Sequence, residues 1–202
     1  VGYRVVVTRS DRVGCASVSR RPKGEVVSDP VSVGIAVARI AIGVIFLAHG
    51  VKHLTGRQKT TRWFEALGFR APGFQWFAST STEIGTGVLL VVGLLTGPAA
   101  AGVIGIMFVA FWTVHRQAGF FITAFMRDDT DVEGYEYVAF LGVVALGLAV
   151  AGPGEFALDS HINVGTSTLA VALDGWVGLG LAVLGLVGGL GLLAAFWRPT
   201  KN

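Results

Sequence analysis

The sequence predicts an all-α fold, a polytopic transmembrane helical bundle of five helices. Of the 202 residues, 52% are hydrophobic and only 14% are charged, whereas soluble domains carry about 25% charged residues. The mean hydropathy is +0.65. Apolar segments recur along the chain, and many of the 29 glycines lie inside them, as is common in membrane helices. Five such helices buried in a soluble protein of this length would leave too little polar surface, so we expect lipid around them.

A polar tail precedes the first apolar segment. Residues 1–32 contain six lysines and arginines and no apolar core of a signal peptide, so we expect a disordered tail. The chain starts at Val1 and not at a methionine. One hypothesis is that an alternative start codon has been written as valine and that part of the tail is not translated. The one cysteine, Cys15, lies in this tail. A single cysteine excludes a cysteine-pair relay and a cysteine-ligated metal cluster within the chain.

Five segments have the composition of transmembrane helices, for which about 20 apolar residues cross about 30 Å of hydrocarbon. The predicted spans are 33–51, 76–95, 99–114, 135–151 and 169–197. The third and fourth spans are short, at about 17 residues, and need interfacial help or local thinning of the bilayer. The aromatic stretch 62–68 is typical of a short interfacial helix. Residues 96–98 (Thr-Gly-Pro) predict a tight turn between the second and third spans.

The spans alternate in direction, which divides the loops between two sides. Side A holds the 52–75 loop, the 115–134 loop and the C-terminus; side B holds the tail, the 96–98 turn and the 152–168 connector. Nine lysines and arginines outside the spans lie on side A and six on side B, all six in the tail. The positive-inside rule therefore favours side A as the cytoplasmic side, with the N-terminus outside.

Ionisable residues gather at the side-A end of the spans. His49, Lys52 and His53 have i, i+3, i+4 spacing and share one face of a helix. Glu83 lies about 10 Å deep and Arg39 lies deeper still, so we expect these two residues to form an ion pair. The catalytic candidates are Glu83, His49 and Arg39, and the candidates for binding a substrate or quinone are Lys52, His53, His115 and Glu136. The sequence predicts no comparable cluster within the helices at side B.

Each part of this pattern also has a simpler explanation. A buried pair of Arg39 and Glu83 can fix helix register without any chemistry, and polar residues at the membrane–water boundary cost little. His49 and His115 could in principle hold a haem, but both lie near helix ends and single histidines are not specific. No metal site is predicted.

Four motifs follow one another along the predicted spans. The first span carries Arg39-x3-Gly43-x2-Phe46-x2-His49-Gly50-x-Lys52. The second carries Glu83-x3-Gly87-x-Leu89-Leu90-x2-Gly93-Leu94-x-Thr96, and the third ends in Ala110-x4-His115-x3-Gly119-Phe120-Phe121. The fourth span and the turn after it carry Glu136-Tyr137 and Gly152-Pro-Gly154-x3-Leu158-Asp159. Together these motifs cover about residues 35–160 and resemble the DoxX/DoxD family of small integral membrane proteins.

The resemblance implies a four-helix membrane domain over residues 33–160, with 1–32 as a tail and 161–202 as a connector and a fifth transmembrane helix. Some family members resemble the small subunit of a thiosulfate:quinone oxidoreductase, and others are linked to membrane complexes for thiol and oxidant defence or quinone stress. The tail and the fifth span depart from the family core. They weaken the transfer of any particular enzyme activity.

Two classes of function follow as hypotheses. The first is a membrane subunit of a redox-linked or oxidative-stress complex that uses quinone, in which Glu83 and His49 handle protons while Lys52 and Arg39 stabilise negative charge. The alternative is a non-catalytic scaffold that anchors partner proteins. A small-solute transporter is less favoured, because no inverted repeat or broken helix is visible. Whether the protein is an enzyme stays open.

The fifth span offers a surface for another helix. Gly185-x3-Gly189 is a small-residue motif that lets helices approach closely. It predicts either an intramolecular lid on the bundle or an interface to a membrane-associated protein partner. The basic residues form no long stripe, which argues against a nucleic-acid partner. The expected location is a bacterial plasma membrane, as a multi-pass protein.

Overall fold

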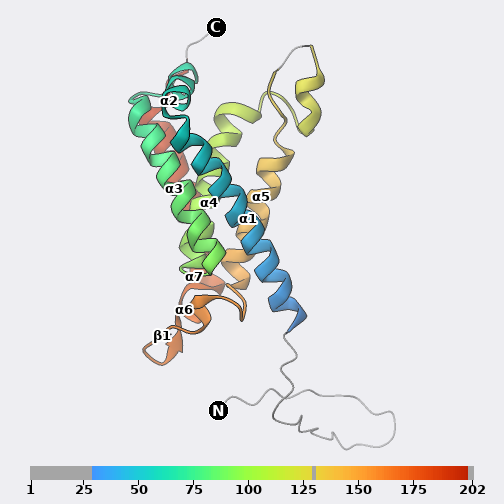
Figure 1. Ribbon diagram of the computed structural model, residues 1–202, viewed down its shortest axis with the longest axis vertical. Helices are drawn as coiled ribbons and strands as arrows, with labels where there is room; N and C mark the ends of the chain where they lie inside the picture. Colours follow the sequence, from blue (N-terminus) through green and yellow to red (C-terminus); the bar gives the residue numbers. More distant parts are fainter. Residues whose placement is uncertain (1–28, 129–130, 200–202) are drawn as a thin grey trace, which may run out of the picture.

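The computed structural model describes residues 29–128 and 131–199, which form an elongated bundle of helices (Figure 1). The long helices are α1 (Pro30–Thr55), α3 (Pro72–Val92), α4 (Thr96–Ala110), α5 (Glu136–Ala151) and α7 (Gly175–Phe196). The shorter elements are α2 (Arg57–Ala66), the π-helix η1 (Phe111–His115), the 3-10 helices η2 (Ile122–Met126) and η3 (Leu158–Ser160), the strands β1 (Asn163–Val164) and β2 (Ser167–Thr168), and α6 (Leu169–Leu173).

Three helices in the described part of the chain are long and apolar enough to cross a membrane. They are α1, the continuous helix Thr96–His115 formed by α4 and η1, and α7, while α5 is a shorter apolar helix. Helix α3 has 21 residues but carries several polar side chains, among them Gln75, Thr80 and Glu83. The prediction of an all-α bundle with apolar helices is confirmed, apart from the small antiparallel hairpin β1–β2, which was not predicted.

Two helix boundaries differ from the prediction because of local capping. Helix α1 begins at Pro30, inside the predicted tail, since the Asp29 side chain accepts a hydrogen bond from the Val31 N–H at 3.3 Å. The rest of the predicted tail, residues 1–28, lies outside the described residues. The turn between α3 and α4 lies at residues 93–95, where Gly93 has φ +71° and Leu95 φ +50°. Residues 96–98 are therefore the first turn of α4.

The predicted fifth span is two helices. A break at Asp174, whose backbone is extended, separates α6 from α7. Gly175 follows with φ +56°, a conformation that glycine adopts more readily than other residues. The membrane-spanning part of this region is therefore α7 alone.

Helix α4 is the centre of the bundle, since it packs against α3, α5 and α7, while α1 packs along α3 and also contacts α5. Buried apolar side chains from these helices form one core: Ile42, Phe46, Leu90, Ala99, Ala100, Val103, Leu141, Ala145, Leu148, Ala149 and Ala182. Small residues bring the backbones close together, because association of helices in lipid depends on packing. A Cβ atom on Gly43 of α1 would lie 2.9 Å from the carbonyl oxygen of Gly87 in α3.

The small-residue motif of α7 packs against another helix of the same chain. A Cβ atom on Gly189 would lie 3.1 Å from the carbonyl oxygen of Gly105 in α4, and Gly185 also packs against the α4 backbone at Ala101. The structure thus corrects the prediction of a partner interface at Gly185 and Gly189. This face of α7 is already covered by α4, as the intramolecular alternative predicted.

The two ends of the bundle carry different elements. Helices α2 and η2 and the C-terminal end of α7 lie at one end, and α6 and the β1–β2 hairpin lie at the other (Figure 1). These ends correspond to the predicted sides A and B. The functional side chains can therefore be placed by their depth between these two ends.

Adjacent glycines in α7 allow a matched test of its packing on α4. We expect Gly189→Leu to lower the free energy of unfolding by about 1–3 kcal/mol, because the new side chain would overlap α4. Gly188→Leu should have little effect, since a Cβ atom there meets no heavy atom within 4 Å. Thermal unfolding of the purified full chain in detergent measures both. Equal melting temperatures for the two variants would contradict the packing.

Candidate functional site

Close contact between α1 and α3 builds the site at the side-A end. A Cβ atom on Gly50 of α1 would lie 2.6 Å from Ile84 Cγ1 and 3.2 Å from Glu83 Cβ. The absence of a side chain at residue 50 therefore lets the α1 backbone approach α3 beside Glu83. His53, three residues further along α1, is placed on this face of α3.

Glu83 is a buried carboxylate with two partners. His53 Nδ1 lies 2.9 Å from Glu83 Oε2, and the Ser79 hydroxyl donates a hydrogen bond to Glu83 Oε1 at 3.2 Å. Glu83 is 5% exposed, whereas the His53 side chain is 19% exposed. Trp76 Nε1 donates a hydrogen bond to the His53 carbonyl oxygen at 2.9 Å, which ties the end of α1 to α3. The pair thus joins a buried acid to a group near the surface.

His49 and Lys52 extend this site outward. The ring of His49 lies perpendicular to that of His53, with 6.4 Å between centroids. His49 and Lys52 are both exposed on α1. The predicted grouping of His49, Lys52 and His53 with Glu83 is therefore present. A proton could pass between the bilayer–water boundary and Glu83 through the histidines, since imidazole can both accept and donate a proton.

The other two predicted binding residues have a different place. His115 Nδ1 donates a hydrogen bond to the Glu133 carbonyl oxygen at 2.8 Å. Glu136 Oε2 accepts a hydrogen bond from the Ile122 N–H at 3.0 Å. These contacts hold the segment between η1 and α5. His115 and Glu136 are thus anchors of this segment in the structure.

Arg39 does not pair with Glu83, contrary to the prediction. Its guanidinium donates hydrogen bonds to the carbonyl oxygens of Leu90, Val91 (3.0 Å) and Phe156 (3.2 Å). The reason is the register of the helices. Gly50 is the residue of α1 that faces Glu83, and Arg39 lies eleven residues earlier, about 16 Å along the helix axis. Helix α3 extends beyond the end of α1 at side A. The depths of Arg39 and Glu83 counted from the connecting loop therefore underestimated the distance between them along the helices.

Side B therefore contains a buried polar cluster that the sequence did not predict. The Asp159 carboxylate accepts hydrogen bonds from the N–H groups of Leu95 (2.8 Å) and Thr96 (2.9 Å), at the start of α4. Arg39 and Asp159 are each 1% exposed and attract each other electrostatically. The cluster joins α1, the end of α3, the start of α4 and the connector. The signal in the sequence was Asp159 in the turn motif, which was not assigned a role.

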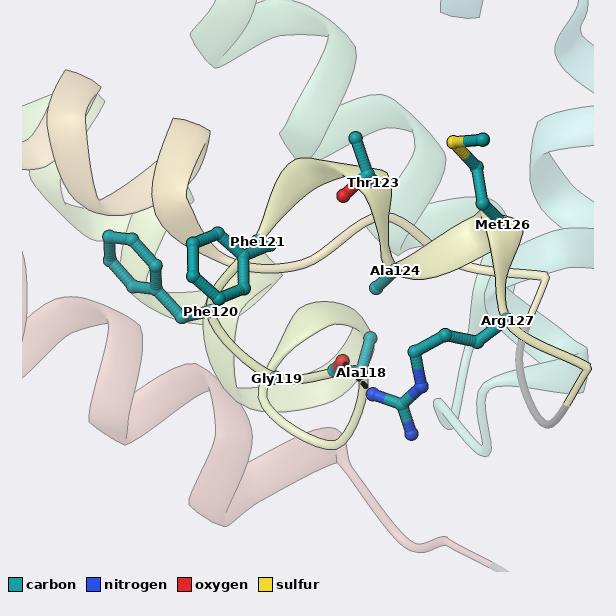
Figure 2. Close-up of a pocket in the computed structure, with 8 residues that line it drawn as sticks. All are labelled: Ala118, Gly119, Phe120, Phe121, Thr123, Ala124, Met126 and Arg127. Atoms are coloured by element: carbon teal, nitrogen blue, oxygen red, sulfur yellow. Dashed lines mark hydrogen bonds between the residues drawn. The ribbon is translucent and has the colours of Figure 1, made fainter.

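The segment between η1 and α5 contains a cavity of about 300 Å³. Phe120 and Phe121 lie at one end of it and Met126 at the other, while Arg127 reaches across to donate a hydrogen bond to the Ala118 carbonyl oxygen at 3.1 Å (Figure 2). Phe121 and Met126 are 69% and 74% exposed. The sequence had predicted only a polar loop here, because its charged residues obscured the apolar run.

Residues 34–116 match the DoxX family model. This part of the chain is therefore similar to the DoxX family. The matched region contains most of α1, all of α2, α3, α4 and η1, and hence the whole of the site around Glu83. The predicted resemblance is confirmed.

Curated relatives agree with this assignment. The chain is 29% identical to inner membrane protein YqjF of Escherichia coli over 65% of the chain and 93% of that protein. It is 27% identical to the Bacillus subtilis protein named "Putative oxidoreductase CatD" over 66% of the chain and 90% of that protein. Inner membrane protein YphA of Escherichia coli is 26% identical over 62% of the chain and 87% of that protein. No solved structure matches the chain significantly.

These findings confirm the predicted location. The two Escherichia coli relatives are inner membrane proteins by name, and the described helices include three long enough and apolar enough to span. The protein is therefore a multi-pass protein of a bacterial inner membrane, in contact with the lipid bilayer.

The side-B cluster gives a stability prediction. We expect Arg39→Met to lower the free energy of unfolding by about 3 kcal/mol, because it leaves buried carbonyl oxygens and the Asp159 carboxylate without their cation. Arg62→Met, on the exposed face of α2, serves as the control and should change stability little. Thermal unfolding in detergent compares the two. Equal melting temperatures for Arg39→Met and the native chain would show that the cluster does not stabilise the fold.

Proposed function

We propose that this DoxX-like protein is the membrane subunit of a redox-linked complex and that its side-A site binds a quinone headgroup. The observation that carries the proposal is the pairing of buried Glu83 with the partly exposed His53 at 2.9 Å. In this proposal α1, α3, α4, α5 and α7 each cross the bilayer. Residues 33–160 form the family core, and 161–202 add the connector and the fifth span.

The chemistry of quinones suits this arrangement. Reduction of a quinone to a quinol takes up two electrons and two protons at its two carbonyl oxygens. A partner redox protein in the complex supplies the electrons, and His53 donates a proton to a carbonyl oxygen of the bound headgroup. His53, held by the Glu83 carboxylate, then takes a proton from water by way of His49, and the second carbonyl oxygen takes its proton from water at the bilayer boundary. Lys52, exposed next to the site, stabilises the negative charge that forms during reduction.

Three further facts support the proposal. The site is at the end of the helices, where a lipid-soluble headgroup can reach it from the membrane. CatD, one of the relatives, has a name that describes a candidate oxidoreductase. Most of the lysines and arginines outside the spans lie at side A, which favours the cytoplasmic side for this site. Arg39 takes no part in this scheme, because its guanidinium is bound to carbonyl oxygens near side B.

The proposal is tested by titrating the purified full chain in detergent with decylubiquinone and following the quenching of tryptophan fluorescence. Trp76 touches His53 and is a suitable reporter. We expect saturable quenching in the native chain and about tenfold weaker binding, about 1.4 kcal/mol, in Glu83→Gln. The amide leaves His53 without its carboxylate partner, so the histidine is a weaker donor to the quinone oxygen.

Glu65→Gln is the matched control, because Glu65 is an exposed acid at the same end of the bundle. It should bind decylubiquinone as the native chain does. Absence of saturable quenching in the native chain, or equal affinity in the Glu83 and Glu65 variants, would contradict the quinone site. Proteins that co-purify with the native chain and with Glu83→Gln alike, without any quinone, would favour the scaffold hypothesis.

A further inference from the structure

A second cavity lies at side A, away from the contact between α1 and α3 that forms the site around Glu83. Its volume is about 390 Å³, within the range of about 300–1,000 Å³ common for small-molecule sites. It lies between the end of α2, the π-helix η1 and the end of α7, and is lined by Ala66, Leu67, Trp112, Thr113, Val114, Arg116, Gln117, Trp197 and Pro199. It shares no residue with the site around Glu83.

The walls of this cavity are joined to one another. Trp197 Nε1 donates a hydrogen bond to the Leu67 carbonyl oxygen at 2.9 Å. The Arg198 N–H donates one to the Gly68 carbonyl oxygen at 2.8 Å. These bonds fix the end of α7 against the turn after α2. On the third wall, the helix changes from α to π at Phe111, and such π-turns occur frequently at functional sites.

The cavity has hydrogen-bond donors without acceptors. The Arg116 guanidinium lies over the Trp112 ring, 4.6 Å from its centroid. Within residues 29–128 and 131–199, the side chains of Arg116 and Gln117 make no hydrogen bond or ion pair. The lining residues include no aspartate or glutamate. The cavity therefore combines a cation against an aromatic ring with a neighbouring amide, and its lining contains no acid. Such a set of donors suits an anionic ligand with several acceptor oxygens.

We propose that this cavity binds a phosphate ester, the headgroup of an anionic membrane phospholipid. A phosphodiester presents acceptor oxygens to the Arg116 fork and to the Gln117 amide. Two features favour a lipid as the source. Tryptophans are enriched at the membrane–water boundary, and the cavity contains Trp112 and Trp197. Trp112 is 38% exposed and stacks on Phe108, one turn deeper in α4, which gives an acyl chain an apolar path from the headgroup.

The test is native mass spectrometry of the full chain in detergent, incubated with phosphatidylglycerol or with zwitterionic phosphatidylcholine. We expect the native chain to retain phosphatidylglycerol in preference, and Arg116→Gln to retain it about tenfold less. Arg57→Gln is a matched control, because the Arg57 guanidinium also stacks 4.6 Å from a tryptophan ring, that of Trp76, but lies outside this cavity. It should retain the lipid as the native chain does.

Two further measurements keep the outcome decisive. Arg116→Lys, which keeps the charge and loses the planar fork, should retain an intermediate amount of lipid and the native melting temperature. Glycerol phosphate, a soluble phosphate ester, should displace phosphatidylglycerol only weakly, since it lacks the acyl chains. Equal lipid retention by the Arg116 and Arg57 glutamine variants would overturn the proposal. So would tight, Arg116-dependent binding of glycerol phosphate by a chain that retains no phosphatidylglycerol.

Discussion

Close packing of α1 on α3 is the constraint on which the positions of the polar side chains depend. Helix association in a bilayer gains little from the hydrophobic effect, because lipid tails are as apolar as leucine side chains. Glycines at residues 43, 50 and 87 let the two backbones approach closely enough for dispersion contacts. The same contact sets the register, so that the end of α1 lies beside Glu83 and its middle lies beside the end of α3.

Both buried charged groups of this helix pair have partners within that register, but the partners differ in chemistry. Glu83 has a histidine and a serine, two groups that can exchange protons or hydrogen bonds with a ligand. Arg39 has backbone carbonyl oxygens and the buried Asp159 at the start of α4, in a cluster that joins three helices. A buried charge in lipid must be paired. At side A the partners of Glu83 can also interact with a ligand, whereas at side B the partners of Arg39 stabilise the fold.

The remaining helices add surfaces to this pair. Helix α4 covers the other side of α3, and α7 covers α4 through its own glycines, so that the added span completes the bundle. Where these helices end at side A, two cavities form, one in the segment before α5 and one between η1, α2 and α7. The chain thus presents aromatic and cationic groups at the side-A end of the bundle.

The sequence by itself determined the apolar helices and the grouping of His49, Lys52 and His53, because these follow from composition or from spacing within one helix. The resemblance to the DoxX family followed from motifs in order along the chain. Only the tertiary structure decided which polar groups meet across helices. Arg39 was assigned to Glu83 from depth alone, yet depth counted from a loop ignores how far one helix is shifted along another. The shift of α1 along α3 also brought Arg39 close to Asp159, and the register of α7 on α4 placed Gly185 and Gly189 against the α4 backbone. Contacts between helices depend on register, and register is set by backbone packing that no single segment encodes.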